Sequence, residues 1–226
     1  MASITSASAS SALAPVVATG SGSEANPKSA TWVFGYGSII WRPDFEFAEK
    51  RTGWVNDHTR RFWQGSPDHR GQPGALGRVL TLVPELGSEC WGVCYRLPKE
   101  KEDDIMAALD YRERGGYVRI NVPFEYEVSP GVTEKVTAIT YIASPDNKYY
   151  LGPVPMEDMV RQIYFARGES GKNIDYVLNL ARHLETMGLA DDHIHELAVQ
   201  LESRAAKEAI PAQLQSPVQT TTQVIA

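Results

Sequence analysis

The sequence predicts an α+β fold in which a small β-barrel is flanked by helices. Residues 31–141 consist of short segments rich in β-branched and aromatic residues, separated by Gly, Pro and Asp turns. After residue 147 the apolar spacing becomes helical, and Pro and Gly residues mark the helix ends. Strands that precede helices along the chain are typical of α+β proteins, and the number of short strands favours a barrel.

A single domain is expected over residues 31–209. Residues 1–30 are dominated by Ala, Ser, Thr and Gly, and residues 210–226 hold Gln, Thr, Ser and Pro around scattered Val and Ile. Neither segment carries enough apolar surface to order itself, so we expect a disordered N-terminal extension at 1–30 and a disordered C-terminal tail at 210–226. The part between them has the usual size of one domain.

The strand-rich part is expected to contain one inserted helix, at residues 99–114. This helix follows Pro98 and ends at Gly115-Gly116, because glycines commonly terminate helices. These bounds place Glu113 in the last helical turn. The expected apolar face of the helix consists of Ile105, Ala108 and Leu109. The expected strands are 32–34, 61–63, 78–83, 89–97, 118–126 and 135–142.

Three helices are expected in the last third of the chain. The first begins at Pro155, a residue favoured in the first helical turn, and runs to Gly168. The second runs from Asn173 to Gly188. The third begins at Asp191 or Asp192 and ends near Ala209.

Composition argues against several classes of partner. A formal net charge of −6 makes a nucleic-acid partner unexpected, because phosphate binding needs clustered Lys and Arg. The apolar stretch at 12–18 is broken by Pro15 and lacks a preceding basic residue, so neither a signal peptide nor a membrane span is expected. Cys90 and Cys94 are expected to be free thiols of a cytoplasmic protein, and no ligand set for a metal accompanies them.

The glycine-rich segment Gly35-Tyr36-Gly37-Ser38 follows the first strand and has two interpretations. It is not a dinucleotide-binding fingerprint, because Ile40 stands where the third glycine is needed. Successive backbone N–H groups in such a turn can bind an anion. The alternative is a tight turn at a barrel corner.

Glu113 also has two interpretations from the residues alone. Flanked by Arg112 and Arg114, it could be an ordinary solvated charge. An anion at a helix C-terminus, however, faces the negative end of the helix dipole, and such breaches of local preference often mark function. For the histidines, surface or loop positions are the simpler interpretation, although His69 is also a candidate for lining a pocket.

Several segments together closely resemble the ChaC family of glutathione-specific γ-glutamylcyclotransferases. The resemblance runs from Trp32 to about Leu180. Three departures from the family pattern are Ile39 for Leu, Arg114 for Lys, and Lys148 where Pro is common. The segments that carry the resemblance are Val33-Phe34-Gly35-Tyr36-Gly37-Ser38-Ile39-Ile40-Trp41, Arg60-Arg61-Phe62-Trp63-Gln64-Gly65-Ser66, Asp68-His69-Arg70-Gly71, Gly77-Arg78-Val79, Trp91-Gly92-Val93, Arg112-Glu113-Arg114-Gly115-Gly116-Tyr117 and Tyr150-Leu151-Gly152-Pro153.

The resemblance implies cleavage of reduced glutathione to 5-oxoproline and cysteinylglycine, without metal or organic cofactor. It implies that Glu113 is the catalytic base and acid. Two rivals remain: a cyclotransferase for other γ-glutamyl amines, and a non-catalytic binding protein on the same scaffold. The resemblance places the substrate loop of the family on Tyr36, Gly37, Ser38 and Ile39, and Phe34 and Gly35 before it are also expected to bind substrate. Candidates for holding substrate carboxylates are Arg61, Arg78 and Tyr150. For those three, structural pairing is the alternative.

Overall fold

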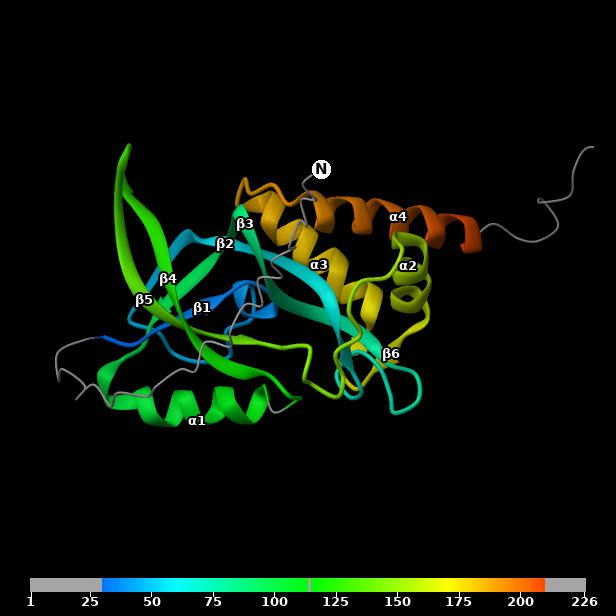
Figure 1. Ribbon diagram of the computed structural model, residues 1–226, viewed down its shortest axis with the longest axis horizontal. Helices are drawn as coiled ribbons and strands as arrows, with labels where there is room; N and C mark the ends of the chain where they lie inside the picture. Colours follow the sequence, from blue (N-terminus) through cyan, green and yellow to red (C-terminus); the bar gives the residue numbers. More distant parts are fainter. Residues whose placement is uncertain (1–29, 114, 210–226) are drawn as a thin grey trace, which may run out of the picture.

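The structure is a computed structural model that describes residues 30–113 and 115–209 (Figure 1). The segments expected to be disordered, 1–30 and 210–226, lie outside the described residues except for Ala30. The strands are β1 (Trp32–Gly35), β2 (Glu49–Ser66), β3 (Gly77–Arg96), β4 (Val118–Ser129), β5 (Val132–Ile142), β6 (Arg167–Gly168) and β7 (Gly171–Lys172). The helices are α1 (Glu102–Arg112), α2 (Met156–Phe165), α3 (Asn173–Thr186) and α4 (Asp192–Ala209), with short 3-10 turns η1 (Ser38–Ile40) and η2 (Lys99–Lys101).

The fold is mixed α+β, as the sequence predicts, and its five long strands pair in the order β1-β3-β2-β4-β5. Strand β5 pairs again with β1, so the ring of pairings closes. Only this last pair is parallel, with Val33 opposite Ile139. The residues of β1 are buried, and the Phe34 ring lies 5.4 Å from the ring of Phe124. The side chains of β1 therefore belong to the hydrophobic core that the ring of strands encloses.

Two strands are much longer than the sequence predicts. The expected strands 78–83 and 89–97 are parts of one strand, β3, and the expected strand 61–63 is the end of β2. The pairing of β2 with β3 is kept by a bulge between Asn56 and His58. Asp57 adopts a left-handed φ of 57°, and its carboxylate accepts the Gly87 N–H at 2.8 Å. With this contact, β3 continues through residues 84–88, where the sequence predicts a turn between two strands.

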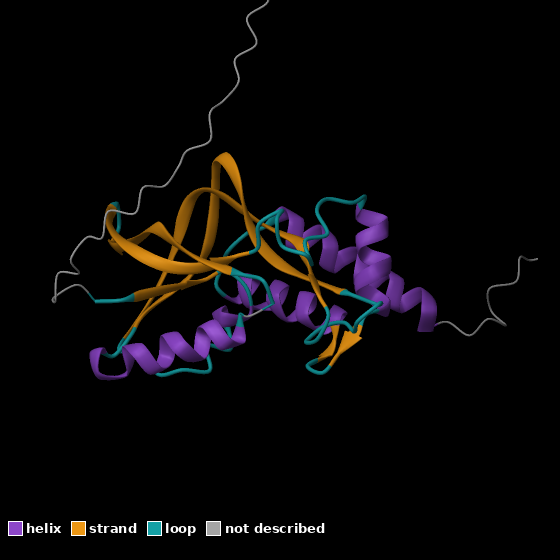
Figure 2. Ribbon diagram, turned by 60° about the horizontal axis from the view of Figure 1, so that its bottom comes forward, coloured by secondary structure: helices purple, strands orange, loops and turns teal. Residues whose placement is uncertain are grey.

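The helices lie on two sides of the strands. Figures 1 and 2 show α1 alone along one side and α2, α3 and α4 grouped on the other. Helix α1 is shorter than predicted, because residues 99–101 form a 3-10 turn and Glu113 is its C-cap; Arg114 lies outside the described residues. Ala108 is exposed and Met106 is buried instead.

Among the three later helices, α2 ends earlier than the sequence predicts. Helix α2 stops at Phe165, and the expected end at Gly168 is wrong because β6 and β7 pair into a small hairpin, with Gly168 opposite Gly171. Helix α4 begins as predicted, since Asp191 Oδ1 accepts the Ile194 N–H at 3.1 Å. The hairpin projects from this group toward the loop after β2, and it forms one wall of the cavity described next.

Candidate active site

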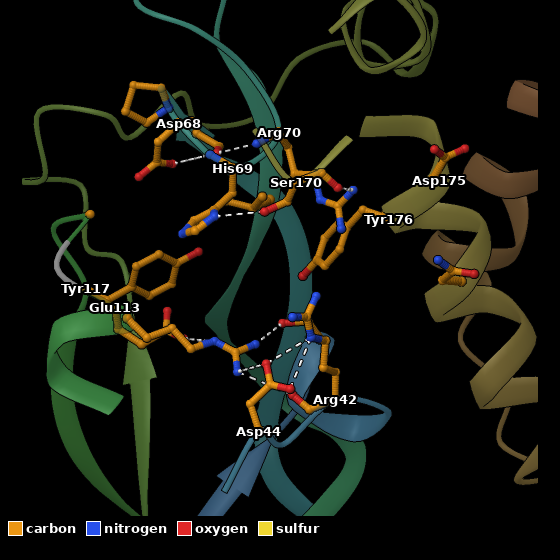
Figure 3. A pocket seen from close by; sticks show the side chains of 18 of the residues that line it. Arg42, Asp44, Asp68, His69, Arg70, Glu113, Tyr117, Ser170, Asp175 and Tyr176 are labelled. Atoms are coloured by element: carbon orange, nitrogen blue, oxygen red, sulfur yellow. Dashed lines mark hydrogen bonds and ion pairs between the residues drawn. The ribbon is translucent and has the colours of Figure 1, made fainter. Parts of the chain in front are cut away.

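A cavity of about 570 Å³ opens where four segments distant in sequence meet (Figure 3). These segments are the loop after β1, the loop after β2, the end of α1 with the residues that follow it, and the hairpin with the start of α3. The cavity is lined by Ser38, Trp41, Arg42 and Asp44; by Gly65, Ser66, Pro67, Asp68, His69 and Arg70; by Arg112, Glu113, Gly115 and Tyr117; by Ser170, Asp175, Tyr176 and Asn179; and by Val79.

The glycine segment forms a tight corner between β1 and η1. A Cβ on Gly35 would lie 2.7 Å from Ile39 Cγ2, and one on Gly37 would lie 2.9 Å from the Tyr176 hydroxyl oxygen, so both positions need a residue without a side chain. The Tyr36 hydroxyl donates a hydrogen bond to the carbonyl of Tyr141 at 2.6 Å. The corner is therefore packed against the strands, and it presents Ser38 to the cavity.

A buried arginine holds this corner from behind. Arg60, 1% exposed, donates from Nη1 to the Tyr36 carbonyl at 2.8 Å. Its Nε lies 2.9 Å from Asp191 Oδ2, at the start of α4. The Arg60 side chain thus connects the glycine segment to the helical group, although the sequence suggests a site role for its neighbour Arg61 instead.

Glu113 lies at the end of α1, where the chain leaves the helix. Its N–H still donates to the Leu109 carbonyl at 2.9 Å, and its side chain is 20% exposed on the cavity wall. Its carboxylate Oε1 lies 3.5 Å from Arg112 Nε. The end of α1 therefore places a carboxylate in the cavity, as the interpretation of Glu113 as a functional residue requires.

The environment of Glu113 favours its neutral form more than water does. Burial raises the pKa of the Glu113 carboxyl above its ordinary value, Asp68 raises it further, and the Arg112 guanidinium opposes both. Tyr176 lies close by, and burial together with the Glu113 charge raises its pKa to about 12. Burial also raises the pKa of Tyr36 and of Tyr117, with the Glu113 charge contributing. A carboxyl whose pKa is raised in a lined cavity is suited to general acid–base chemistry.

Arg112 bridges the two halves of the site. Its Nη2 donates to Ser38 Oγ at 2.8 Å, while its Nε faces Glu113. Its Nη1 lies 3.5 Å from Asp44 Oδ2. The guanidinium therefore couples the glycine corner to the carboxylate at the end of α1.

The structure brings some of the expected site residues together and leaves others apart. Ser38 and Glu113 line the same cavity, and His69 lines it as well. Gly35, Tyr36 and Gly37 lie behind Ser38, and the side chains of Phe34 and Ile39 are buried in the core.

The three residues expected to hold substrate carboxylates do not line the cavity. Arg61 pairs with Glu85 at 3.1 Å. Arg78 is 3% exposed and donates to the carbonyls of Phe62 and Gly152. Tyr150 belongs to a turn and forms an isolated bridge with Gln64. For Arg61 and Arg78 the structural alternative therefore describes the side chain.

Several cavity residues have no role that the sequence alone assigns. Four of them lie within the segments that carry the family resemblance, Asp44 and Ser170 follow Pro43 and Gly168 in loops, and Tyr176 lies in α3. A pattern of local spacing does not show which loop side chains converge. The principal ones are Arg112, Asp44, Asp68, Arg70, Tyr117, Ser170 and Tyr176.

Metal ligands and membrane-spanning helices are not found in the described part of the chain. No group of three or more His, Cys, Asp or Glu side chains within residues 30–113 and 115–209 is placed to hold a metal ion. None of the helices in these ranges combines the length and apolar character needed to cross a bilayer. Cys90 and Cys94 are buried and unpaired, as predicted.

Comparison with known proteins shows which family the chain is similar to. The ChaC-like protein family matches residues 31–204. The chain is 39% identical over 188 residues to glutathione-specific gamma-glutamylcyclotransferase 1 of Mus musculus, covering 81% of this chain and 83% of that protein. It is 40% identical over 176 residues to gamma-glutamylcyclotransferase 2-3 of Arabidopsis thaliana, covering 76% and 88%.

A solved structure shares the fold. The crystal structure of selenomethionine-labelled γ-glutamyl cyclotransferase specific to glutathione from yeast superimposes with a TM-score of 0.73 at 25% sequence identity. The match covers 77% of this chain and 96% of the yeast chain. On the family match, the sequence identities and the shared fold, the chain belongs to the ChaC-like protein family.

Proposed function

We propose that this protein is a glutathione-specific γ-glutamylcyclotransferase, which cleaves reduced glutathione to 5-oxoproline and L-cysteinylglycine. One observation carries the proposal: Glu113, a carboxylate whose pKa is raised by burial, shares a cavity with Ser38 at the end of the glycine corner. Relatives that carry this name cover most of the chain.

The reaction needs no nucleophile from the enzyme. The α-amine of the γ-glutamyl group attacks the γ-carbonyl carbon of the same group and closes a five-membered ring. Collapse of the tetrahedral intermediate breaks the bond to the cysteine nitrogen. Holding an intramolecular reaction in its productive geometry can contribute roughly 7–11 kcal/mol, so positioning is the main task of the cavity.

Glu113 serves as one proton carrier for both steps. The α-amine attacks in its neutral form; the ionised Glu113 carboxylate accepts one proton from it as the ring closes, and the resulting carboxylic acid protonates the leaving cysteine nitrogen. A single residue suffices because the proton taken in the first step is the one returned in the second. The raised pKa of Glu113 brings it closer to neutrality, where such a carrier works best.

The glycine corner is proposed to form the oxyanion-binding part of the site. Backbone N–H groups of the Tyr36-Gly37-Ser38 turn are proposed to stabilise the charge that develops on the γ-carbonyl oxygen. The side chains of Phe34 and Ile39 support this turn from the core. The protein is expected to act on this small-molecule substrate without a nucleic-acid or membrane partner.

Three broader assignments accompany this function. We propose that residues 31–209 form the cyclotransferase domain, and that the closed ring of strands is the small β-barrel of this fold. The closure of the pairings through β1 and β5 supports the second assignment. A cytoplasmic location is proposed because the two cysteines are buried free thiols.

The test is the Glu113→Gln variant, assayed for 5-oxoproline release from glutathione. The nearly isosteric amide keeps the shape of the cavity but carries no proton between nitrogens, so we expect a loss of at least about 100-fold in kcat with glutathione still bound. Glu100→Gln, at an exposed position before α1, is the matched control and is expected to retain activity.

Two results would contradict the proposal. Substantial turnover by a folded Glu113→Gln protein would remove Glu113 from the catalytic role. Faster 5-oxoproline release from γ-glutamyl-alanine or γ-glutamyl-lysine than from glutathione would assign the chain to a different γ-glutamyl substrate. An unmodified protein that releases 5-oxoproline from none of these would be a binding protein on the same scaffold.

A further inference from the structure

The cavity contains three arginines, and two of them are already paired with carboxylates. Arg42 lies 2.9 Å from Asp44 and its side chain is 67% exposed. Arg112 lies between Asp44 and Glu113 and also donates to Ser38. The contacts of these two arginines therefore lie on the side of the cavity that holds Glu113.

Arg70 differs from both. Its guanidinium forms no ion pair with any Asp or Glu of residues 30–113 and 115–209, and within these ranges its guanidinium hydrogen bonds all come from Nη1. That nitrogen donates to the carbonyls of Ser170 and Lys172, at 2.8 and 3.1 Å. Nε and Nη2 of the Arg70 guanidinium therefore remain for a ligand, and these two donors have the spacing that matches a carboxylate.

The position of Arg70 is set by one ring contact and two hydrogen bonds. The guanidinium carbon lies 5.3 Å from the centre of the Tyr176 ring, and the two carbonyls belong to the hairpin of β6 and β7. The hairpin is itself held to the loop of Arg70, because the N–H of Ser170 donates to the His69 carbonyl at 3.0 Å. Figure 3 shows Arg70 beside Ser170 and Tyr176, across the cavity from Glu113.

The Arg70 guanidinium is also partly withdrawn from water. Burial lowers its pKa from the ordinary arginine value, while the charge of Asp175 and the nearby Tyr176 oppose that change. Arginine stays protonated in proteins, so a cation with spare donors faces the cavity. Such a group gains more from an anionic ligand than an exposed arginine does.

Resting on the proposed function, we propose that Arg70 binds the glycine carboxylate of glutathione and thereby selects the tripeptide over shorter γ-glutamyl compounds. When the γ-glutamyl group reacts beside Glu113, the cysteinylglycine portion must extend away from that wall. Its far end carries a carboxylate, which is the chemistry that the spare donors of Arg70 recognise. The glycine corner and Glu113 would then act on the reacting end, and Arg70 on the distal end.

The experiment compares two substrates on several enzymes. Glutathione and its glycine ethyl ester differ only in the distal carboxylate, and 5-oxoproline release gives kcat/KM for each. For the unmodified protein we expect glutathione to be preferred over the ester by roughly 10- to 100-fold, the range of a charge-assisted hydrogen bond. For Arg70→Met we expect activity on glutathione to fall to that on the ester, so that the preference disappears.

Controls separate recognition from structural support. Loss of the hairpin contacts alone would lower activity on both substrates equally and leave the preference intact, which would overturn the proposal. Arg70→Lys, which keeps the charge but not the paired donors, is expected to retain part of the preference. Arg161→Met, an exposed arginine on α2, is expected to retain all of it.

The unmodified protein alone already provides a test, even if Arg70→Met does not fold. Equal kcat/KM for glutathione and its ester would overturn the role of Arg70 while leaving the cyclotransferase function standing. No 5-oxoproline from either substrate would overturn the function, and the role of Arg70 with it. The two failures are therefore distinguishable.

Discussion

At the scale of single residues, Arg112 influences the charge of the partly buried carboxylate of Glu113. Its Nε lies 3.5 Å from Glu113 Oε1, and its Nη2 donates to Ser38 at 2.8 Å. Burial and Asp68 favour the neutral carboxyl, and Arg112 is the cation that opposes them. The same guanidinium thus sets both the charge of the proton carrier and its position relative to the glycine corner.

Replacing this cation is expected to change the pH dependence of activity. Glu113 accepts a proton only when ionised, so activity is lost as the pH falls through its pKa. Because Arg112 lowers the pKa of Glu113, Arg112→Met raises it, and the acid limb of kcat/KM moves to higher pH. We expect the loss of kcat/KM relative to the unmodified protein to grow as the pH falls and to shrink as the pH rises.

A control distinguishes charge from packing in this experiment. Arg112→Lys restores the positive charge without the bond geometry, so its acid limb should lie between those of the unmodified protein and Arg112→Met. An equal loss of activity at every pH in Arg112→Met would show that the guanidinium only supports the loop.

At the scale of the elements, a buried arginine joins β2 to the glycine corner and to the start of α4. Arg60 donates to the Tyr36 carbonyl at 2.8 Å and lies 2.9 Å from Asp191, whose other oxygen caps α4. A third donor contact reaches the Trp91 carbonyl in β3. One side chain thus connects three elements that share no local sequence.

Neighbouring arginines on β2 provide a matched pair of variants. Arg60→Met leaves Asp191 without its buried partner, so we expect the free energy of unfolding to fall by about 3–5 kcal/mol. Arg61→Met removes only the more exposed pair with Glu85, and about 0–1 kcal/mol is expected. Urea denaturation followed by tryptophan fluorescence measures both. Equal costs for the two variants would contradict the connecting role of Arg60.

At the scale of the whole molecule, two glycines face each other where β2 and β3 pass close to the neighbouring strands β4 and β1. Gly53 of β2 is paired with Gly92 of β3. A Cβ on Gly53 would overlap the Glu125 carbonyl oxygen of β4, and one on Gly92 would lie 2.5 Å from the Gly35 carbonyl oxygen of β1. The absence of side chains at this pair lets neighbouring strands cross closely enough to close the ring.

Substitution at this crossing should weaken the entire fold. Gly53→Ala forces backbone apart from backbone, and we expect a loss of at least about 2 kcal/mol in the free energy of unfolding. Gly115→Ala is the control, because no atom lies within 4 Å of its added Cβ. Thermal unfolding by circular dichroism compares the two. An unchanged Tm for Gly53→Ala would mean that the ring closes without this close approach.

Local pattern is sufficient for the features that depend on neighbours in the chain. Gly115-Gly116 follows the end of α1, and this pair of glycines is why the sequence by itself places Glu113 at the helix C-terminus. The glycine corner after β1 and the start of α4 are also predictable, since each rests on one turn or one cap.

The tertiary structure alone decided which charged side chains form the site. Successive side chains on β2 point to opposite faces, so Arg60 is buried while its neighbour Arg61 is only partly buried and pairs with Glu85. Arg70 and Arg78 both lie in segments that carry the family resemblance, yet Arg78 donates to backbone carbonyls and Arg70 faces the cavity. Arg70 acquires its place from a hairpin about a hundred residues later, through its bonds to Ser170 and Lys172. Contacts between segments so distant along the chain depend on how the strands and helices pack, and local composition does not encode them.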